Sequence, residues 1–231
     1  MTKYIIVAKN MPQNAKDTLI NLGYSLIDSA ELTNVHPSLK YHPDMQIVKC
    51  ENAYICAPEC YGYYKPYFEN IGIGLIKGYE NPKQNYPFDV LYNVAIVGNN
   101  AIHNFKYTDK SFLENNSYNL IDVKQGYSKC SLCVISDNAV ITSDEGIKKQ
   151  LENYNIDVLL VNKGDVTLEP FEYGFVGGAS GIVDGKIAFC GDVTLHSDYN
   201  KIKNFCNKHN VEILNLSQVV PVDVGTIIML G

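Results

Sequence analysis

The sequence contains no arginine and no tryptophan, and all 19 of its basic residues are lysine. Arginine is the side chain that holds a carboxylate or phosphate through two parallel hydrogen bonds, so this chain cannot recognise an anion in that way. A low-GC genome is an alternative explanation, because such genomes favour codons for Lys, Asn, Ile and Tyr, all of which are abundant here. Both explanations remain open.

Long hydrophobic runs are also missing. The apolar run near the N-terminus covers only residues 4–8, which is too short for the core of a signal peptide or for a membrane span. Seven cysteines are an odd number in a chain without an export signal, so we expect reduced thiols rather than disulfides. These features predict a cytoplasmic protein with no membrane partner.

The chain has fewer positively charged residues than negatively charged ones, 19 against 25. The formal net charge is −6 at pH 7, which argues against a nucleic-acid partner or an anionic membrane, since both require a basic surface. A cationic or neutral ligand fits this balance better. With 46% hydrophobic residues in 231, the chain can bury a sizeable core, so we expect a single folded domain over residues 1–231.

A repeat is visible in the spacing of short turn signals. Four dipeptides that tolerate the positive φ angles of hairpin turns lie between pairs of β-rich runs. They are Glu51-Asn52, Asn99-Asn100, Asp137-Asn138 and Asp184-Gly185, and successive turns are 48, 38 and 47 residues apart.

Each turn is expected to join two strands that are followed by a helix and a third strand. Around Asn138 the strands are predicted at 131–135 and 139–142, an N-cap at 143–145 starts a helix, and a third strand covers 157–161. In the unit around Gly185, the first strand is predicted at 175–183.

A fifth unit is split between the termini. Residues 225–230 would supply its first strand and residues 4–8 its second, followed by a helix at 14–22 and a third strand at 24–28. Pairing the last strand with the first would close a ring and remove an exposed sheet edge. Five units in 231 residues give a period of about 46. The order differs from a doubly wound sheet, in which single strands alternate with helices.

The predicted α/β fold resembles the pentein fold, a five-bladed α/β propeller of ββαβ units found in guanidino-group-modifying enzymes. The segment His42-Pro43-Asp44, which leads into a hydrophobic strand, is similar to the His-x-Asp segment of those enzymes. The resemblance implies that His42 is an acid/base group and that Asp44 helps to bind a guanidinium ion. It also implies a bacterial member of a fold family that includes arginine deiminase-like, dimethylargininase-like and amidinotransferase-like enzymes and a non-catalytic ribosome factor.

The repeat indicates which residues would meet at the ring axis. Equivalent positions in a rotational repeat point at the axis together, and alignment on the turns makes five residues equivalent. These are Asp44, Tyr92, Cys130, Gly177 and Asp223. On a strand, residues two apart share a face, so His42 is expected beside Asp44.

This set predicts chemistry on a cation. Asp44 and Asp223 would hold a planar cation through charged hydrogen bonds, the Cys130 thiolate would attack its carbon, and His42 would move protons. Tyr92 and the glycines Gly177 and Gly178 would line the pocket.

Lys124 stands just before Cys130 in the sequence and would supply a cation to the pocket. A lysine in a loop is more commonly a solvated surface residue.

One departure from the family leaves catalysis open. Catalytic penteins carry their nucleophilic Cys in a Gly-rich segment near the C-terminus, whereas here residues 223–228 contain no Cys. Cys130 and Cys133 have a CxxC spacing, but no second pair exists to complete a zinc site, so we expect neither a metal nor another cofactor.

Two functions therefore remain. The first is a hydrolase or amidinotransferase-like enzyme that acts on a non-peptide C–N bond of a guanidine-like or other carbon–nitrogen substrate, with a small guanidine-like cation as its expected ligand. The second is a non-catalytic pentein-fold binding protein. The sequence does not determine the oligomeric state.

Overall fold

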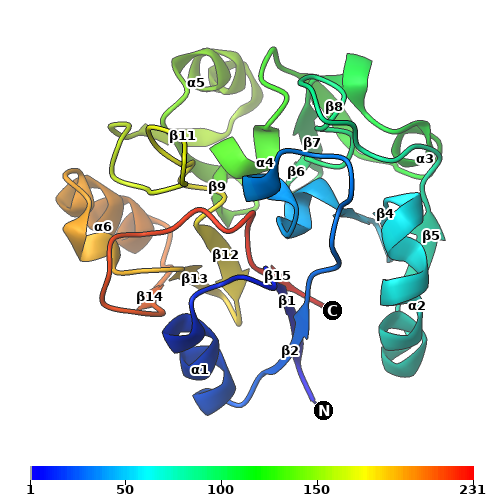
Figure 1. Cartoon of the computed structure of the whole chain (residues 1–231). Helices are drawn as coiled ribbons and strands as arrows, with labels where there is room; N and C mark the ends of the chain where they lie inside the picture. Colours follow the sequence, from blue (N-terminus) through cyan, green and yellow to red (C-terminus); the bar gives the residue numbers. More distant parts are fainter. Residues whose placement is uncertain (1) are drawn as a thin grey trace.

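Five three-stranded sheets form the computed structural model, which describes residues 2–231. In each sheet the first strand pairs antiparallel with the second, and the second pairs parallel with the third. A helix connects the second strand to the third, and the helices lie around the outside of the sheets (Figure 1). The predicted ββαβ repeat is therefore confirmed, and the chain is a five-bladed α/β propeller.

The units follow one another along the chain. The first complete unit contains β3 (Ile47–Cys50), β4 (Ala53–Cys56), α2 (Pro58–Ile71) and β5 (Gly74–Lys77). The second contains β6 (Ala95–Val97), β7 (Asn100–His103), α3 (Lys110–Glu114) and β8 (Asn119–Asp122). The third contains β9 (Cys133–Ser136), β10 (Ala139–Thr142), α5 (Glu145–Leu151) and β11 (Asp157–Leu160). The fourth contains β12 (Ser180–Val183), β13 (Lys186–Phe189), α6 (Tyr199–Lys208) and β14 (Ile213–Asn215).

The remaining unit joins the two ends of the chain. It contains β15 (Ile228–Met229), β1 (Tyr4–Val7), α1 (Gln13–Asn21) and β2 (Ser25–Asp28). Strand β15 pairs antiparallel with β1, with Ile5 opposite Met229 and Ile6 opposite Ile228. The predicted ring closure is confirmed, and this pairing covers the edge that β1 would otherwise expose.

Short helices occupy several of the connections. The 3₁₀ helices are η1 (Pro37–Leu39), η2 (Pro43–Met45), η3 (Phe105–Tyr107), η4 (Glu152–Tyr154) and η5 (Val193–Leu195). A single turn of α-helix, α4 (Ser128–Ser131), precedes β9. In Figure 1 the segment containing η2 and the turn α4 lie near the centre of the ring.

Helix α2 illustrates how the outer layer packs. It begins at Pro58, and proline suits this position because the first turn of a helix does not use the amide hydrogen that proline lacks. It ends at the C-cap residue Gly72, whose φ of 72° is the left-handed conformation that favours glycine. Cys60, Tyr64 and Phe68 recur every four residues and are fully buried. Within residues 2–231, no helix is long and apolar enough to cross a membrane.

The first strands of the units surround the ring axis. Strand β12 packs against β9 and β15, and β9 packs against β6. A cavity of about 210 Å³ is lined by residues from all five first strands. The axis is therefore where side chains from all units can meet.

Candidate active site on the ring axis

The site is built from the short segments that precede the first strands. Asp44 comes three residues before β3, Cys130 three residues before β9, and Gly177 three residues before β12. Asp223 precedes β15 in the same way, at a slightly greater distance along the chain. Because the first strands lie around one axis, the segments leading into them converge.

His42 and Asp44 come together for a different reason than the one expected. The prediction that they share the face of a strand is wrong, because Pro43–Met45 forms the 3₁₀ helix η2 and His42 occupies its N-cap position. The amide of Asp44 donates to the carbonyl oxygen of Gly225 at 3.1 Å, which fixes η2 against the C-terminal segment. Gly225 has a φ of 69°, and a Cβ there would lie 2.3 Å from the Cβ of His42, so this position favours glycine.

Cys130 lies in α4 and faces Asp44. Its thiol donates a hydrogen bond to Oδ2 of Asp44 at 2.9 Å, across 86 residues of sequence. The side chain of Cys130 is only 2% exposed and that of Asp44 only 1%. The two residues that the repeat alignment made equivalent are therefore in direct contact.

Asn93 is the site residue that the sequence analysis missed. Its Nδ2 donates to the Cys130 sulfur at 3.2 Å, and its Oδ1 accepts from the amide of Cys130 at 3.2 Å. Tyr92, the expected residue, instead directs its hydroxyl to the carbonyl of Glu80 and to Asp109, although it lines the cavity beside the first strands. The signal in the sequence was an asparagine two residues before an apolar strand, one position after the aligned residue.

Asp223 is held by backbone amides. Its Oδ2 accepts from the amide of Phe175 at 2.9 Å, and its Oδ1 accepts from the amide of Gly225 at 3.0 Å. Its Oδ1 also lies 3.9 Å from Nδ1 of His42. Asp223, near the C-terminus, therefore lies beside His42 from the N-terminal part of the chain.

Gly177 and Gly178 allow this close packing. The prediction of a strand over 175–183 is wrong at its start, because β12 begins at Ser180 and both glycines lie in the preceding turn. The amide of Gly178 donates to the carbonyl of Cys130, and a Cβ on Gly178 would lie 2.0 Å from the Asp223 carboxylate. A Cβ on Gly177 would lie 2.5 Å from the backbone of Leu132.

The surroundings of Cys130 and Asp223 raise the pKa values of both groups. Burial, together with the charges of Asp44 and Asp223, raises the pKa of the Cys130 thiol well above its ordinary value. Burial also raises the pKa of Asp223, an effect that His42 opposes and Asp44 reinforces. Two buried polar atoms, Nδ1 of His42 and Oδ1 of Asp44, have no hydrogen-bond partner within the described part of the chain.

A cavity of about 290 Å³ opens onto this cluster. His42, Cys130 and Asp223 line its floor, and Glu172 lies among its other lining residues. The remaining walls are apolar or aromatic and consist of Leu39, Tyr127, Leu168, Phe171, Tyr173 and Phe175. Asp44 instead lines the cavity between the first strands, so the cluster separates the two spaces.

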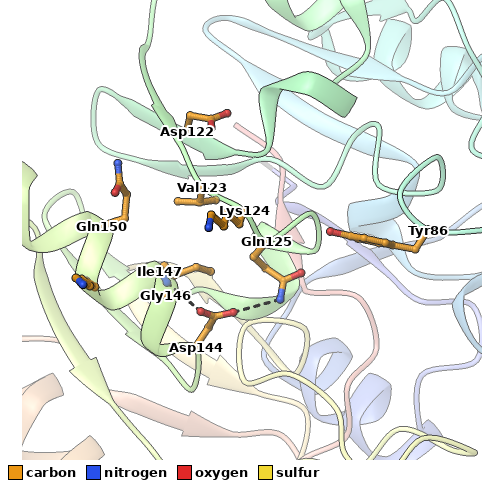
Figure 2. A pocket seen from close by; sticks show the side chains of 10 residues that line it. Tyr86, Asp122, Val123, Lys124, Gln125, Asp144, Gly146, Ile147 and Gln150 are labelled. Atoms are coloured by element: carbon orange, nitrogen blue, oxygen red, sulfur yellow. Dashed lines mark hydrogen bonds between the residues drawn. The ribbon is translucent and has the colours of Figure 1, made fainter.

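Lys124 lies elsewhere. It lines a separate pocket of about 630 Å³ between the end of β8 and helix α5, together with Asp144 and Gln150. Figure 2 shows this pocket, in which Gln125 donates a hydrogen bond to Asp144. Lys124 is exposed and is not among the residues that line either axial cavity.

Three of the clustered residues have the donor atoms of a metal site. One ligand atom from each of His42, Asp44 and Cys130 lies within 4.8 Å of the others. Cys133, the second cysteine of the CxxC spacing, begins strand β9 and is not part of this group.

A family model described as "Family of unknown function (DUF6873)" matches residues 6–228, which is almost the whole chain. The chain belongs to this family. A search of curated protein sequences found no match.

Solved structures with a similar fold share little sequence with this member of the family. DDAH from Pseudomonas aeruginosa, as a mutant in complex with citrulline, matches with a TM-score of 0.55 and 10% identity over 94% of this chain and 92% of its own. An agmatine deiminase from C. jejuni matches with a TM-score of 0.55 and 9% identity, over 94% of this chain and 88% of its own. An amidinotransferase of the saxitoxin biosynthetic pathway from Microseira wollei matches with a TM-score of 0.53 and 9% identity, over 96% and 94%.

These matches agree with the five-unit ring, and the chain has the pentein fold. At such low identity the likeness concerns the fold alone.

Proposed function

We propose that this protein is an enzyme that acts on a C–N bond of a small guanidinium-type cation. Cys130 would be the nucleophile, His42 the group that moves protons, and Asp44 and Asp223 the carboxylates that hold the cation. The observation that carries the proposal is that these four buried side chains meet on the ring axis, where three of them line a cavity and Asp44 contacts Cys130 directly behind it. The guanidine chemistry named for the structural neighbours, which include an agmatine deiminase and an amidinotransferase, is consistent with it.

The charge of the cavity supports a cationic substrate. Its charged lining residues are Asp223 and Glu172, with His42 beside them, and no lysine from residues 2–231 lines it. Because the chain also contains no arginine, the cavity has no permanent cation with which to bind a substrate carboxylate. We therefore expect substrates without a carboxylate, such as agmatine or a simple alkylguanidine, to bind better than arginine.

Substrate charge would activate the nucleophile. In the free protein the raised pKa keeps the Cys130 thiol protonated, and a protonated thiol is a poor nucleophile. A guanidinium ion between Asp44 and Asp223 would offset the negative potential that holds this proton. Binding of the correct cation and formation of the thiolate would therefore be coupled.

The reaction balances with these groups and water. The Cys130 sulfur bonds to the guanidinium carbon while His42 receives the thiol proton, and the C–N bond then breaks as the leaving nitrogen takes this proton from His42. Water next adds to the carbon with His42 as base, the C–S bond breaks, and the sulfur recovers its proton. The net change converts guanidinium and water into a ureido product and ammonium. An amine in place of water would give amidino transfer.

The test is a binding and turnover screen with agmatine, arginine, methylated arginines and guanidinoacetate. Calorimetry would detect binding, and assays for ammonia and ureido products would detect turnover. We expect at least one cation to be turned over, and the Cys130→Ser variant to bind it without releasing product. Cys133→Ser serves as the matched control, because its sulfur lies outside the group formed by His42, Asp44 and Cys130. Turnover that persists in Cys130→Ser would refute the assignment of the nucleophile.

A non-catalytic binding protein is the second candidate. The observation that favours it is that Cys130 is only 2% exposed and that burial raises its pKa, unlike most reactive cysteines. On this alternative a cation binds with the same affinity in Cys130→Ser as in the wild type, and no product forms in either.

A further inference from the structure

We infer that His42, Asp44 and Cys130 form a binding site for a zinc-class divalent cation. The three side chains come from two segments that lie 86 residues apart, and one donor atom from each lies within 4.8 Å of the others. They are an imidazole nitrogen, a carboxylate oxygen and a sulfur. This mixed set suits zinc and cobalt(II), whereas magnesium and calcium prefer oxygen ligands alone.

The donor atoms lie at most 4.8 Å apart, a spacing that side-chain movements can adjust to that around a bound ion. A tetrahedral zinc ion with bonds of about 2.0–2.3 Å holds its ligand atoms roughly 3.3–3.8 Å apart. The Cys130 sulfur and Oδ2 of Asp44 are 2.9 Å apart and share the thiol hydrogen. Small side-chain rotations would place an ion between them, with the thiol proton released to solvent as the sulfur coordinates the metal.

Unpartnered atoms provide a second, independent observation. Nδ1 of His42 and Oδ1 of Asp44 are buried without a hydrogen-bond partner from residues 2–231. A buried polar atom without a partner is costly, so such atoms usually have a ligand, an ion or a water molecule as a partner. Both belong to the same three-residue group, as expected for a group that binds a ligand.

The charge around the group also favours a cation. Asp223 lies next to His42, and throughout the described residues neither Asp44 nor Asp223 forms an ion pair with a lysine. Three protein ligands leave a fourth tetrahedral position, and the cavity of about 290 Å³ beside His42 and Cys130 can admit solvent to it. A divalent ion would therefore relieve the repulsion between the two carboxylates.

Metal binding does not depend on the proposed enzymatic function. A guanidinium ion and a divalent metal would both require Asp44 and Cys130, so their binding is mutually exclusive. If guanidine turnover exists, zinc inhibits it competitively. If no turnover exists, the metal site is unaffected.

Cobalt(II) provides the direct test, because a tetrahedral cobalt site with a thiolate ligand absorbs in the visible and near-ultraviolet regions. The full chain is treated with chelator, dialysed, and titrated with cobalt(II), and zinc is then added to displace it. We expect one cobalt ion per chain with a thiolate-to-cobalt band, and loss of this band on zinc addition. Cys130→Ser should abolish the band. His42→Gln and Asp44→Asn should each weaken cobalt binding by more than roughly 10- to 100-fold. That range is typical for loss of a residue that only hydrogen-bonds to a metal ligand.

Two variants serve as controls. Cys133→Ser removes a buried thiol outside the group, and His209→Gln removes the histidine that contacts Asp157 at 2.7 Å near the surface. Both should keep the cobalt spectrum. Circular dichroism melting identifies any variant that fails to fold, and Asp44→Asn, which preserves side-chain size, then replaces Cys130→Ser as the deciding variant.

The outcomes separate the two proposals. Absence of saturable cobalt binding, or binding that His209→Gln abolishes and Cys130→Ser does not, would overturn the metal site. Cobalt binding by a protein whose chelator-treated, metal-free form turns over no guanidine would support the metal site and reject the enzymatic function. Turnover without metal binding would do the reverse.

Discussion

Replacing Asp44 by asparagine should change two properties of the site in opposite directions. The substitution removes one negative charge and nearly preserves side-chain size. Asp44 is 1% exposed, its Oδ2 accepts the Cys130 thiol, and its Oδ1 has no partner within residues 2–231. A guanidinium ion would lose a charged acceptor, and Cys130 would lose a group that raises its pKa.

The expected size of the binding effect follows from the hydrogen bond that is lost. A hydrogen bond to a charged group contributes about 1.5–3 kcal/mol where water is excluded, so guanidinium affinity should fall by about 10- to 100-fold. The same Asp44→Asn substitution should also lower the pKa of Cys130 toward its ordinary value. At a fixed pH of about 8, a larger thiolate fraction should therefore make alkylation of Cys130 faster.

Calorimetry with agmatine measures the first effect, and mass spectrometry of iodoacetamide-treated protein measures the second residue by residue. Cys133 is the internal reference, because burial raises its pKa to about 12 and it does not contact Asp44. Asp137→Asn, which makes the same change in an exposed turn, is the matched control variant. Faster labelling of Cys133 as well would indicate unfolding. Unchanged affinity together with unchanged Cys130 labelling would refute the placement of Asp44 beside both cation and thiol.

Three further predictions concern the fold around the site. Deleting residues 225–231 removes β15 and should lower the melting temperature of the whole ring, and an unchanged melting temperature would contradict the ring closure. Gly178→Ala should destabilise the protein by about 1–3 kcal/mol in urea unfolding, because the new Cβ would meet the Asp223 carboxylate. Gly62→Ala in α2 is the control and should be neutral or stabilising, because a Cβ there meets no other atom within 4 Å. Burial lowers the pKa of His103 to about 4, so the unfolded chain binds the extra proton and stability should be lost as pH falls from about 6.5 toward 4. This loss reaches about 3 kcal/mol, and a His103→Gln variant that keeps the same pH dependence would exclude His103 as its cause.

Local sequence signals were sufficient to predict the order of the strands and helices. Hairpin turns depend on residues that tolerate positive φ, and Glu51 and Asp184 do adopt φ angles of 48° at the predicted turns. The closing pair of strands was also predictable, because an open ring would leave the edge of β1 unpaired. The repeat then located Asp44 and Cys130 at equivalent positions, and the two side chains touch.

Side-chain direction just before each first strand depended on the tertiary structure. Tyr92 occupies the aligned position, but its hydroxyl donates to Glu80 and Asp109, and Asn93 contacts Cys130 instead. Lys124 is close to Cys130 in sequence, yet it lines a pocket beside α5.

The physical reason is that these segments are not regular strands, so period-2 alternation does not apply to them. Their backbone hydrogen bonds run to other units, as from Asp44 to Gly225 and from Gly178 to Cys130. Which side chain reaches the axis is therefore decided by contacts between units that are far apart in the sequence, and a local pattern carries no record of them.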